Sequence, residues 1–243
     1  MNRVKSSWEI EENAKYFLES ERGAVPGSDL QLDIMASIIQ QWRPDPSNLL
    51  DLGCGDGILG RFMITCFPSV DAIFVDFSDP MLAAAKASLS HIPNAAILKA
   101  DFSSSEWLRV VSSYKLFDVI ISGFAIHHQP DSRKKELYSE IYDLLMPGGV
   151  FLNLEHVKSS TPQVENLFEE YFIEHLHNFQ LKSNPETNKE IVADGFRNRP
   201  DKNEDQLVPV ETQCEWLREI CFKDVDCFFK QFEIGLFGGR KKA

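Results

Sequence analysis

The chain has 243 residues, 43% of them hydrophobic, and a formal net charge of −12. This acidity disfavours nucleic acid as a partner, because affinity for nucleic acid comes largely from Lys and Arg at phosphates. No apolar stretch approaches 18 residues, so we expect no membrane span, and no apolar leader opens the sequence. Five Cys without a CxxC pair or a ligand spacing with His predict reduced thiols, a cytoplasmic protein and no metal site.

Two amphipathic segments near the start of the chain predict an N-terminal helical cap over residues 1–46. Apolar side chains gather on one side of residues 8–19, and they recur at helical spacing over residues 30–42. Pro44 and Pro46 then end the second helix. We therefore expect two helices before the first strand.

Short apolar runs then alternate with helical patterns along the middle of the chain. Helices are expected over residues 80–90 and 131–145, with Asp131 as the cap of the second. Strands separated by helices imply β-α-β crossovers and a doubly wound, mostly parallel sheet of the α/β class. The predicted strands cover residues 48–52, 71–76, 94–98, 117–122 and 150–154.

The alternation stops after Glu155, and residues 156–209 are predicted to form a helical lid inserted after the fifth strand. Its first helix begins at Thr161-Pro162, because Pro suits the first helical position, and runs to about residue 180. The rest of the insertion is polar and rich in turn residues. A connection of this length is typical of a functional loop.

The C-terminal segment predicts one more helix and two further strands. The helix covers residues 211–221, and apolar runs follow at 224–229 and 232–237 with a short break at Lys230-Gln231. We expect the two runs to form a hairpin at the edge of the sheet, with an antiparallel edge strand. The sheet then has seven strands.

The most informative motif is a glycine-rich turn after the first strand. In LLDLGCGDGILG, an apolar run reaches Asp51 and then breaks into Gly53, Gly55 and Gly57. Alternate glycines leave no Cβ between the backbone and a ligand. By itself the segment is ambiguous, because Gly55, Gly57 and Gly60 also satisfy the dinucleotide fingerprint G-x-G-x-x-G.

Acidic residues also follow the second and third strands. Open α/β sheets bind ligands outside the carboxyl ends of their strands. Asp76 stands about 20 residues past the glycine turn, where a carboxylate accepts hydrogen bonds from both ribose hydroxyls of a cofactor. Such a carboxylate fits NAD and S-adenosylmethionine alike. Asp101 occupies the corresponding place after the third strand.

The ordered set of these landmarks resembles the Rossmann-like (class I) methyltransferases that use S-adenosylmethionine. Asp51 before the glycines, Ala-Asp-Phe at 100–102, the fourth strand at 117–122 and Pro-Gly-Gly at 147–149 stand in that family's order over about residues 48 to 155. The resemblance implies that family's fold and S-adenosylmethionine as the cofactor.

The resemblance also implies roles for individual residues. Asp51 is expected near the amino-acid portion of the cofactor, and Asp101 at the adenine amino group. In many relatives glycine stands at the position of Cys221, so a positive φ there would strain the cysteine. The further expected cofactor contacts are Gly53, Gly55, Gly57, Asp76, Phe77, Met81, Phe102 and Ser122.

The segment after the fourth strand faces the reactive methyl group in this family. His127 and His128 lie there, and histidines near pH 7 suit proton transfer, so each is a candidate general base. The other interpretation of His128 is that it caps or packs against the next helix. Glu155 and His156, at the end of the fifth strand, are weaker candidates.

The insertion carries aromatic residues at helical spacing and two nearby arginines. The aromatic stripe that includes Tyr171 is typical of a core face, and a lid helix also makes it a pocket wall. Arg197 and Arg199 would clamp a carboxylate or phosphate, or else pair with the acidic surface. Together with Phe124, these three residues form the expected acceptor contacts.

These observations predict a methyltransferase that acts on a small apolar or anionic molecule. One alternative is similarity to carboxy-S-adenosylmethionine synthases, which carry out a tRNA-modification step. It rests on Arg22, Pro26-Gly27, the long helix after the fifth strand and the loop before Glu211-Thr212-Gln213. Another is a non-catalytic partner protein that binds S-adenosylmethionine. The oligomeric state stays open, with a homodimer as one option.

Overall fold

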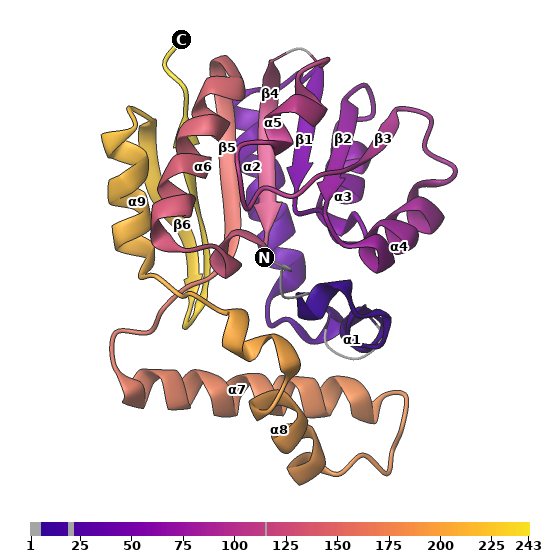
Figure 1. Ribbon diagram of the computed structural model, residues 1–243. Coiled ribbons are helices and arrows are strands. Elements are labelled where there is room, and N and C mark those ends of the chain that lie inside the picture. The colour runs from indigo at the N-terminus through magenta and orange to yellow at the C-terminus, as the bar shows by residue number, and fades with distance from the viewer. Residues whose placement is uncertain (1–5, 19–21, 115) are drawn as a thin grey trace, which may run out of the picture.

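The strands form a sheet with helices on both sides (Figure 1), and apolar residues are buried on both faces of the sheet. The computed structural model describes residues 6–18, 22–114 and 116–243. Within these residues, seven strands form one sheet in the order β3-β2-β1-β4-β5-β7-β6. Neighbours run parallel except in the pairs β5–β7 and β7–β6. The strands are β1 (Asn48–Leu52), β2 (Asp71–Asp76), β3 (Ala95–Lys99), β4 (Phe117–Gly123), β5 (Leu145–His156), β6 (Lys223–Gln231) and β7 (Ile234–Arg240).

Helices cover both faces of the sheet, because side chains alternate between the faces along each strand. In β1, Leu49 belongs to one apolar cluster, whereas Leu50 and Leu52 belong to the other. The cluster around Leu49 includes side chains of α2 (Ser28–Trp42), α3 (Ile58–Cys66) and α4 (Asp79–Leu89). The opposite cluster includes side chains of α5 (Trp107–Val111), α6 (Asp131–Leu144) and α9 (Val210–Glu219).

The predicted fold class is thereby confirmed, with differences at the C-terminal edge of the sheet. The antiparallel strand is β7, but it lies between β5 and the outermost strand β6. The hairpin turn falls at Phe232-Glu233 rather than at Lys230-Gln231, because Gln231 still pairs with Ile234. Phe232 accommodates the tight turn with a φ of 52°.

Helix ends also differ from the prediction. Asp131 is the first residue of α6 and not its cap, which is Pro130. The Asp131 carboxylate instead lies 3.2 Å from Nζ of Lys134. The expected helix over residues 8–19 is shorter, since Ile10 is extended between η1 (Ser7–Glu9) and α1 (Glu11–Tyr16). Residue 19 lies outside the described residues.

The insertion at residues 156–209 contains two packed helices and a short 3-10 turn. These are α7 (Pro162–Leu181), α8 (Lys189–Arg197) and η5 (Pro200–Glu204). A third apolar cluster joins Ile173 and Leu176 of α7 to Phe196 of α8. Helix α8 was not expected, because it is short and lies in a polar stretch. Both helices lie beyond the carboxyl ends of the parallel strands, on the same side as α1 (Figure 1).

The turn after α9 places a cysteine in a conformation that favours glycine. Cys221 has a φ of 84°, so the condition under which the sequence predicts strain at this cysteine is met. Its N–H donates to the carbonyl of Arg218, and the N–H of Phe222 donates to the carbonyl of Leu217. This pair of bonds is a Schellman motif, whose left-handed position usually holds glycine.

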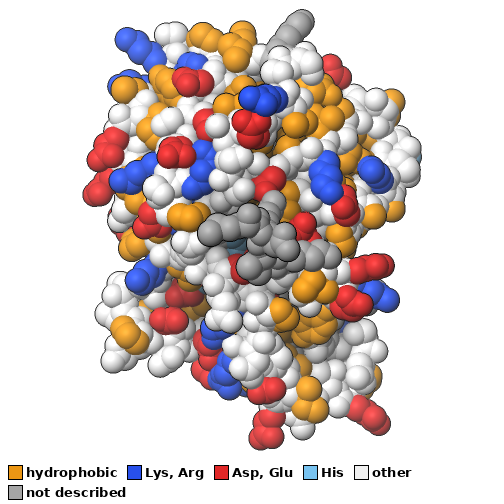
Figure 2. All heavy atoms as spheres, in the orientation of Figure 1, with side chains coloured by type: hydrophobic (Ala, Val, Ile, Leu, Met, Phe, Trp, Pro, Cys, Tyr) orange, Lys and Arg blue, Asp and Glu red, His pale blue; other side chains and the backbone are white. Residues whose placement is uncertain are grey.

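None of the described helices combines the length and the apolar character that a membrane crossing requires. On the face shown in Figure 2, Lys and Arg side chains are scattered among Asp and Glu. Both signs of charge are therefore present on this face, although the chain has a formal net charge of −12.

Candidate active site

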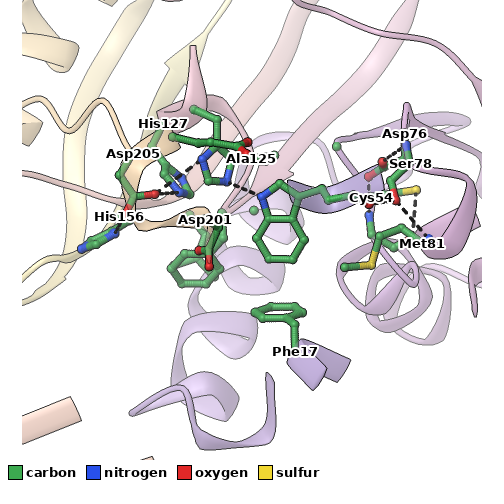
Figure 3. A pocket seen from close by; sticks show the side chains of 18 of the residues that line it. Phe17, Cys54, Asp76, Ser78, Met81, Ala125, His127, His156, Asp201 and Asp205 are labelled. Atoms are coloured by element: carbon green, nitrogen blue, oxygen red, sulfur yellow. Dashed lines mark hydrogen bonds and ion pairs between the residues drawn. The ribbon is translucent and has the colours of Figure 1, made fainter. Parts of the chain in front are cut away.

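A cavity of about 410 Å³ lies at the carboxyl ends of the parallel strands. Its volume is in the range typical of small-molecule sites. The turns after β1, β2 and β3 form one side, the turn after β4 and the insertion form the other, and the N-terminal segment also lines the cavity. Figure 3 shows Cys54, Asp76, Ser78 and Met81 on one side and His127, His156, Asp201 and Asp205 on the opposite side.

The glycine turn brings bare backbone to the cavity. Gly53 has a φ of 71°, and a Cβ built on it would lie 2.3 Å from Cβ of Ala125. The turns after β1 and β4 therefore approach more closely than any side chain at position 53 permits. The N–H of Gly55 donates to Oδ2 of Asp76 over 2.9 Å, which ties the glycine turn to the end of β2.

Asp76 is the buried carboxylate of this side of the cavity. Its side chain lines the cavity although the residue is only 7% exposed. Burial raises the pKa of Asp76, and hydrogen bonds from the backbone of Ser78 and Gly55 oppose that effect. Several other residues expected at the cofactor also line this side, namely Phe77, Met81, Asp101 and Phe102.

Three of the expected cofactor contacts do not line the cavity. Asp51 is fully buried, and its Oδ2 accepts the N–H of Gly60 over 2.9 Å. Gly57 caps the start of α3 with a φ of 83°. Ser122 donates to the carbonyl of Leu52 over 2.7 Å, between β4 and β1. These residues hold the glycine turn and its helix in place.

Gly60 has a packing role that explains the apparent dinucleotide fingerprint. A Cβ at Gly60 would lie 2.3 Å from Cε1 of Phe74 in β2. The third glycine of the fingerprint is therefore required by the contact between α3 and the sheet. The third glycine of dinucleotide-binding folds has the same packing role, so Gly60 does not distinguish the two cofactors.

The opposite side of the cavity is built around His127, in the 3-10 turn η4 (Ile126–His128) after β4. Its Nδ1 lies 2.5 Å from Oε1 of Glu155, and its backbone N–H donates to Oε2 of the same carboxylate. Its Nε2 lies 3.4 Å from Oδ1 of Asp205. Burial lowers the pKa of His127, but the two carboxylates outweigh burial and raise the pKa to about 9. Glu155 itself lies behind the histidine, fully buried.

His128 has a different environment from His127. Burial and the adjacent charge of His127 hold the pKa of His128 well below its usual range. Its Nε2 accepts the indole N–H of Trp8 over 3.2 Å, so the neutral ring carries its proton on Nδ1. That Nδ1 is buried, lies 3.5 Å from Oδ1 of Asp205 and makes no hydrogen bond. His128 therefore does not cap helix α6.

Asp205 joins the end of the insertion to the two histidines. The next residue, Gln206, donates its backbone N–H to the carbonyl of His127 over 3.0 Å. Arg199 lies 2.7 Å from Oδ2 of Asp205, and Nδ1 of His156 lies 3.9 Å from the same oxygen. Burial raises the pKa of Asp205, but His127, His156 and Arg199 outweigh burial and lower it to about 2.

The residues expected at the acceptor divide into two groups. Phe124 and Arg199 line the cavity. Arg197 does not, because it is exposed and pairs with Glu169 and Glu170. Tyr171 also lies outside the cavity lining, with its ring 5.3 Å from that of Phe232.

The helical repeat explains why Tyr171 is displaced from the cavity. Phe168 and Phe172 are four positions apart on α7 and share the face that lines the cavity. Tyr171 falls on an adjacent face, where its hydroxyl accepts a hydrogen bond from Gln231. The expected aromatic stripe is therefore partly pocket wall and partly core.

Several residues of the site were not found by sequence reasoning. Trp8 and Phe17 reach the cavity from the N-terminal segment, and Asp201 and Asp205 reach it from the end of the insertion. None of them stands in a motif or at a spacing that signals a site. Only the fold brings these distant segments to the same place.

The central part of the chain is similar to known methyltransferases. Residues 49–149 match the model of a methyltransferase domain. A malonyl-[acyl-carrier protein] O-methyltransferase from Halalkalibacterium halodurans is 31% identical over 110 residues, which are 45% of this chain and 39% of that protein. A carboxy-S-adenosyl-L-methionine synthase from Trichodesmium erythraeum is 23% identical over 190 residues, 76% of this chain and 68% of that protein.

Solved structures of methyltransferases have a similar fold. Human N-acetylserotonin methyltransferase, in a complex with S-adenosylmethionine, superposes with a TM-score of 0.63 at 16% identity, covering 97% of this chain and 58% of that protein. The matches to the first curated relatives span between 39% and 53% of the lengths of those proteins.

Proposed function

We propose that this chain, which belongs to the Rossmann-like family of S-adenosylmethionine-dependent methyltransferases, is itself a methyltransferase acting on a small-molecule acceptor. One observation carries the proposal. The cavity runs without a break from Gly53 and Asp76 at the sheet to Phe172 in the insertion. The cavity therefore joins the strand ends that fit the cofactor to the insertion side, where we place the acceptor.

The residues on the sheet side fit S-adenosylmethionine. A buried carboxylate at Asp76 is suited to accept hydrogen bonds from the ribose hydroxyls. Met81 and Phe102 supply apolar contact surface for the adenine, with Asp101 beside them. Gly53 lines the cavity, and its missing Cβ lets the turn after β1 pack against Ala125 in the turn after β4. When bound, the cofactor supplies an electrophilic methyl group on a sulfonium.

The chain's own residues would act mainly by positioning the acceptor. Holding two reactants in a productive orientation contributes roughly 7–11 kcal/mol to lowering a barrier. Phe168, Phe172 and Phe196 form an apolar wall that excludes water on the insertion side. At neutral pH His127, with a pKa of about 9, carries protons on both ring nitrogens, and the unprotonated Nε2 of His128 already accepts the indole N–H of Trp8. We therefore assign both histidines to the wall of the site rather than to proton abstraction.

The charges of the insertion side narrow the acceptor class. Asp201, Glu204 and Asp205 line the cavity there, and Arg199 pairs with two of these carboxylates. A free carboxylate on the acceptor would meet this excess of negative charge. We therefore propose an apolar acceptor without an acidic group, which narrows the apolar or anionic class that the sequence predicted.

A carboxy-S-adenosylmethionine synthase activity is not favoured by the described residues. Such an enzyme needs an arginine for the extra carboxylate, as the family resemblance implies. Among the described side chains, Arg199 is the arginine that lines the cavity, and it pairs with Asp201 and Asp205. The side chain of Arg22 lies outside the described residues. A non-catalytic role predicts a filled acceptor space, whereas the cavity extends to Phe172.

Calorimetric titration with S-adenosylmethionine and S-adenosylhomocysteine tests the cofactor assignment. We expect binding in the native chain and at least about tenfold weaker binding in Asp76→Asn, because a hydroxyl–carboxylate hydrogen bond is replaced by a neutral one. Asp79→Asn is the matched control, since Asp79 is an exposed carboxylate at the start of α4 that pairs with Lys99. Absence of binding, or equal losses in both variants, contradicts the assignment.

Mass spectrometry of ligands that copurify with the protein separates the alternatives. S-adenosylmethionine or S-adenosylhomocysteine supports the methyltransferase, and a carboxylated cofactor supports the synthase. The acceptor class is tested by release of S-adenosylhomocysteine with paired acceptors that differ only in a carboxylate. Faster turnover of the acid form in these pairs contradicts the proposed class.

A further inference from the structure

We propose that His127, His128 and Asp205 form a binding site for a divalent transition-metal ion in the acceptor wall of the cavity. One ligand atom from each of the three residues lies within 4.8 Å of the others. Imidazole nitrogen with one carboxylate is a donor set that suits zinc and its first-row neighbours. Zinc is the ion that we use below as the probe.

Two of the three separations between ligand atoms already fit coordination, and the third pair, Nε2 of His127 and Nδ1 of His128, lies within 4.8 Å. Nε2 of His127 is 3.4 Å from Oδ1 of Asp205, and Nδ1 of His128 is 3.5 Å from the same oxygen. Zinc bonds to nitrogen and carboxylate oxygen are about 2.0–2.2 Å long, so neighbouring ligands of a tetrahedral ion are roughly 3.3–3.6 Å apart. Both pairs of atoms already have this separation.

Second-layer contacts support the two ends of the site. Glu155 engages Nδ1 of His127, which directs the lone pair of Nε2 toward Asp205 once the ring loses a proton. A carboxylate behind a ligating histidine is the arrangement usual at zinc sites. Arg199 and His156 hold the other oxygen of Asp205, which leaves Oδ1 facing the histidines.

The buried Nδ1 of His128 has no hydrogen bond of good geometry and lies 3.5 Å from Oδ1 of Asp205. A metal ion on Nδ1 would give it a partner. The ring proton would then move to Nε2, where the indole N–H of Trp8 now donates. Two N–H groups cannot face each other at 3.2 Å, so metal binding must displace Trp8 from His128. Metal binding is therefore coupled to a change around Trp8.

The position of the site suggests what else the ion would bind. All three ligand residues line the cavity. The coordination position of the ion that they leave open would therefore face the acceptor space. Three protein ligands with an open position are typical of catalytic rather than structural zinc. The open position would take an oxygen or nitrogen donor of the acceptor, and only this last point rests on the proposed function.

The sequence predicted no metal site because the ligands form no local pattern. His127 and His128 are adjacent, but Asp205 comes from the end of the insertion. Two neighbouring histidines without a third residue at a recognisable spacing carry no metal signal. The backbone bond between Gln206 and His127 is what brings Asp205 to the histidines.

Zinc titration of the metal-free protein tests the site without cofactor or acceptor. We expect one equivalent of zinc to bind, and we expect His128→Ala and Glu155→Gln to weaken binding by about 10–100-fold. His91→Ala is the matched control, because His91 is an exposed histidine outside the cavity. Zinc binding that is unchanged in His128→Ala, or no zinc binding at all, overturns the proposal.

Tryptophan fluorescence provides a second readout that does not depend on activity. Zinc should change the emission of the native chain, and Trp8→Phe should bind zinc without that change. The same zinc addition to His128→Ala should leave the emission unaltered. An emission change that persists in Trp8→Phe overturns the proposed coupling. Failure of the proposed function would appear separately, as absence of S-adenosylmethionine binding in a chain that still takes zinc.

Discussion

The two ends of the cavity are built in different ways. The cofactor end, around Gly53, Gly55 and Asp76, is made by short motifs directly at strand ends, and backbone hydrogen bonds hold it. The acceptor end, around Trp8, His128 and Asp205, is assembled from segments far apart in the sequence. Its geometry depends on ion pairs and on how the insertion docks. The cofactor end is therefore fixed by local backbone geometry, whereas the acceptor end depends on tertiary contacts.

The largest expected effect comes from adding one methyl group at the cofactor end. In Gly53→Ala the new Cβ would lie 2.3 Å from Cβ of Ala125, at a φ of 71°. We expect loss of cofactor binding and a fall of about 2–5 kcal/mol in the free energy of unfolding. Denaturant unfolding and cofactor titration measure the two effects.

Gly148→Ala is the control for the strained backbone alone. Gly148 has a φ of 74°, but a Cβ there meets nothing within 4 Å. We expect a loss of only about 1–2 kcal/mol and unchanged cofactor affinity. If the two variants behave alike, the close approach of the β1 and β4 turns does not determine the cofactor end.

The acceptor end should respond instead to loss of an ion pair. Arg199 is 11% exposed and contacts both Asp201 and Asp205. Arg199→Ala removes the guanidinium from Asp201 and from Oδ2 of Asp205, while His127 and His156 remain near Asp205. We therefore expect a loss of about 2 kcal/mol in the free energy of unfolding. Arg197→Ala removes an exposed arginine from the same helix region and should leave stability nearly unchanged.

Cofactor affinity separates the two ends in this experiment. At temperatures where Arg199→Ala remains folded, it should bind S-adenosylmethionine as the native chain does, because Arg199 contacts residues of the insertion. A loss of cofactor affinity equal to that of Gly53→Ala would show that the two ends form one cooperative unit. Near-equal stability of the Arg197 and Arg199 variants would argue that the acceptor end does not depend on its buried ion pairs.

The pH dependence of cofactor binding offers a finer test. Burial raises the pKa of Asp76, with a smaller contribution from the charge of Asp101. The ribose hydroxyls need the ionised carboxylate as an acceptor, so binding is strongest above this pKa and weakens as pH falls through it. Because the pKa is raised, the weakening should begin at a higher pH than for an ordinary aspartate.

Calorimetry across the acidic range measures this dependence. Asp76→Asn should bind weakly throughout and show a much flatter pH profile, because the amide does not titrate. Asp79→Asn should keep the native profile, as Asp79 is exposed and pairs with Lys99. A native profile retained in Asp76→Asn would assign the titration to another group.

The contrast between the ends also explains what the sequence could predict. The strands, their order of occurrence and most of the cofactor end follow from local patterns, since Gly53 and Asp76 stand at strand ends that periodicity locates. Asp51 was placed at the ligand by resemblance, whereas its carboxylate braces Gly60 behind the turn. A linear motif does not show whether the Asp51 side chain points toward the ligand or toward Gly60.

At the acceptor end, sequence reasoning found residues but not their relations. His127, His128 and Arg199 were identified as candidates, but their partners Glu155, Trp8 and Asp205 decide what they can do. Helical periodicity grouped Tyr171 with Phe172 in one aromatic stripe. In the structure the two side chains point to different surroundings, and of the two Phe172 lines the cavity. Helix α8 was missed because it is short and lies in a polar stretch, although Phe196 packs in one cluster with Ile173 of α7 and Ala24.

The smallest expected effect lies outside both ends and calibrates the others. Cys221 occupies the left-handed position of the Schellman turn after α9, with a φ of 84°. Cys221→Gly relieves a strain of about 1–2 kcal/mol but gives the unfolded chain more freedom, so we expect a net gain of up to about 1 kcal/mol. Cys221→Ala keeps the Cβ and should gain nothing. Denaturant unfolding measures both variants, and cofactor and zinc titrations should be the same for each. A gain in Cys221→Ala equal to that in Cys221→Gly would place the cost in the thiol rather than in the backbone.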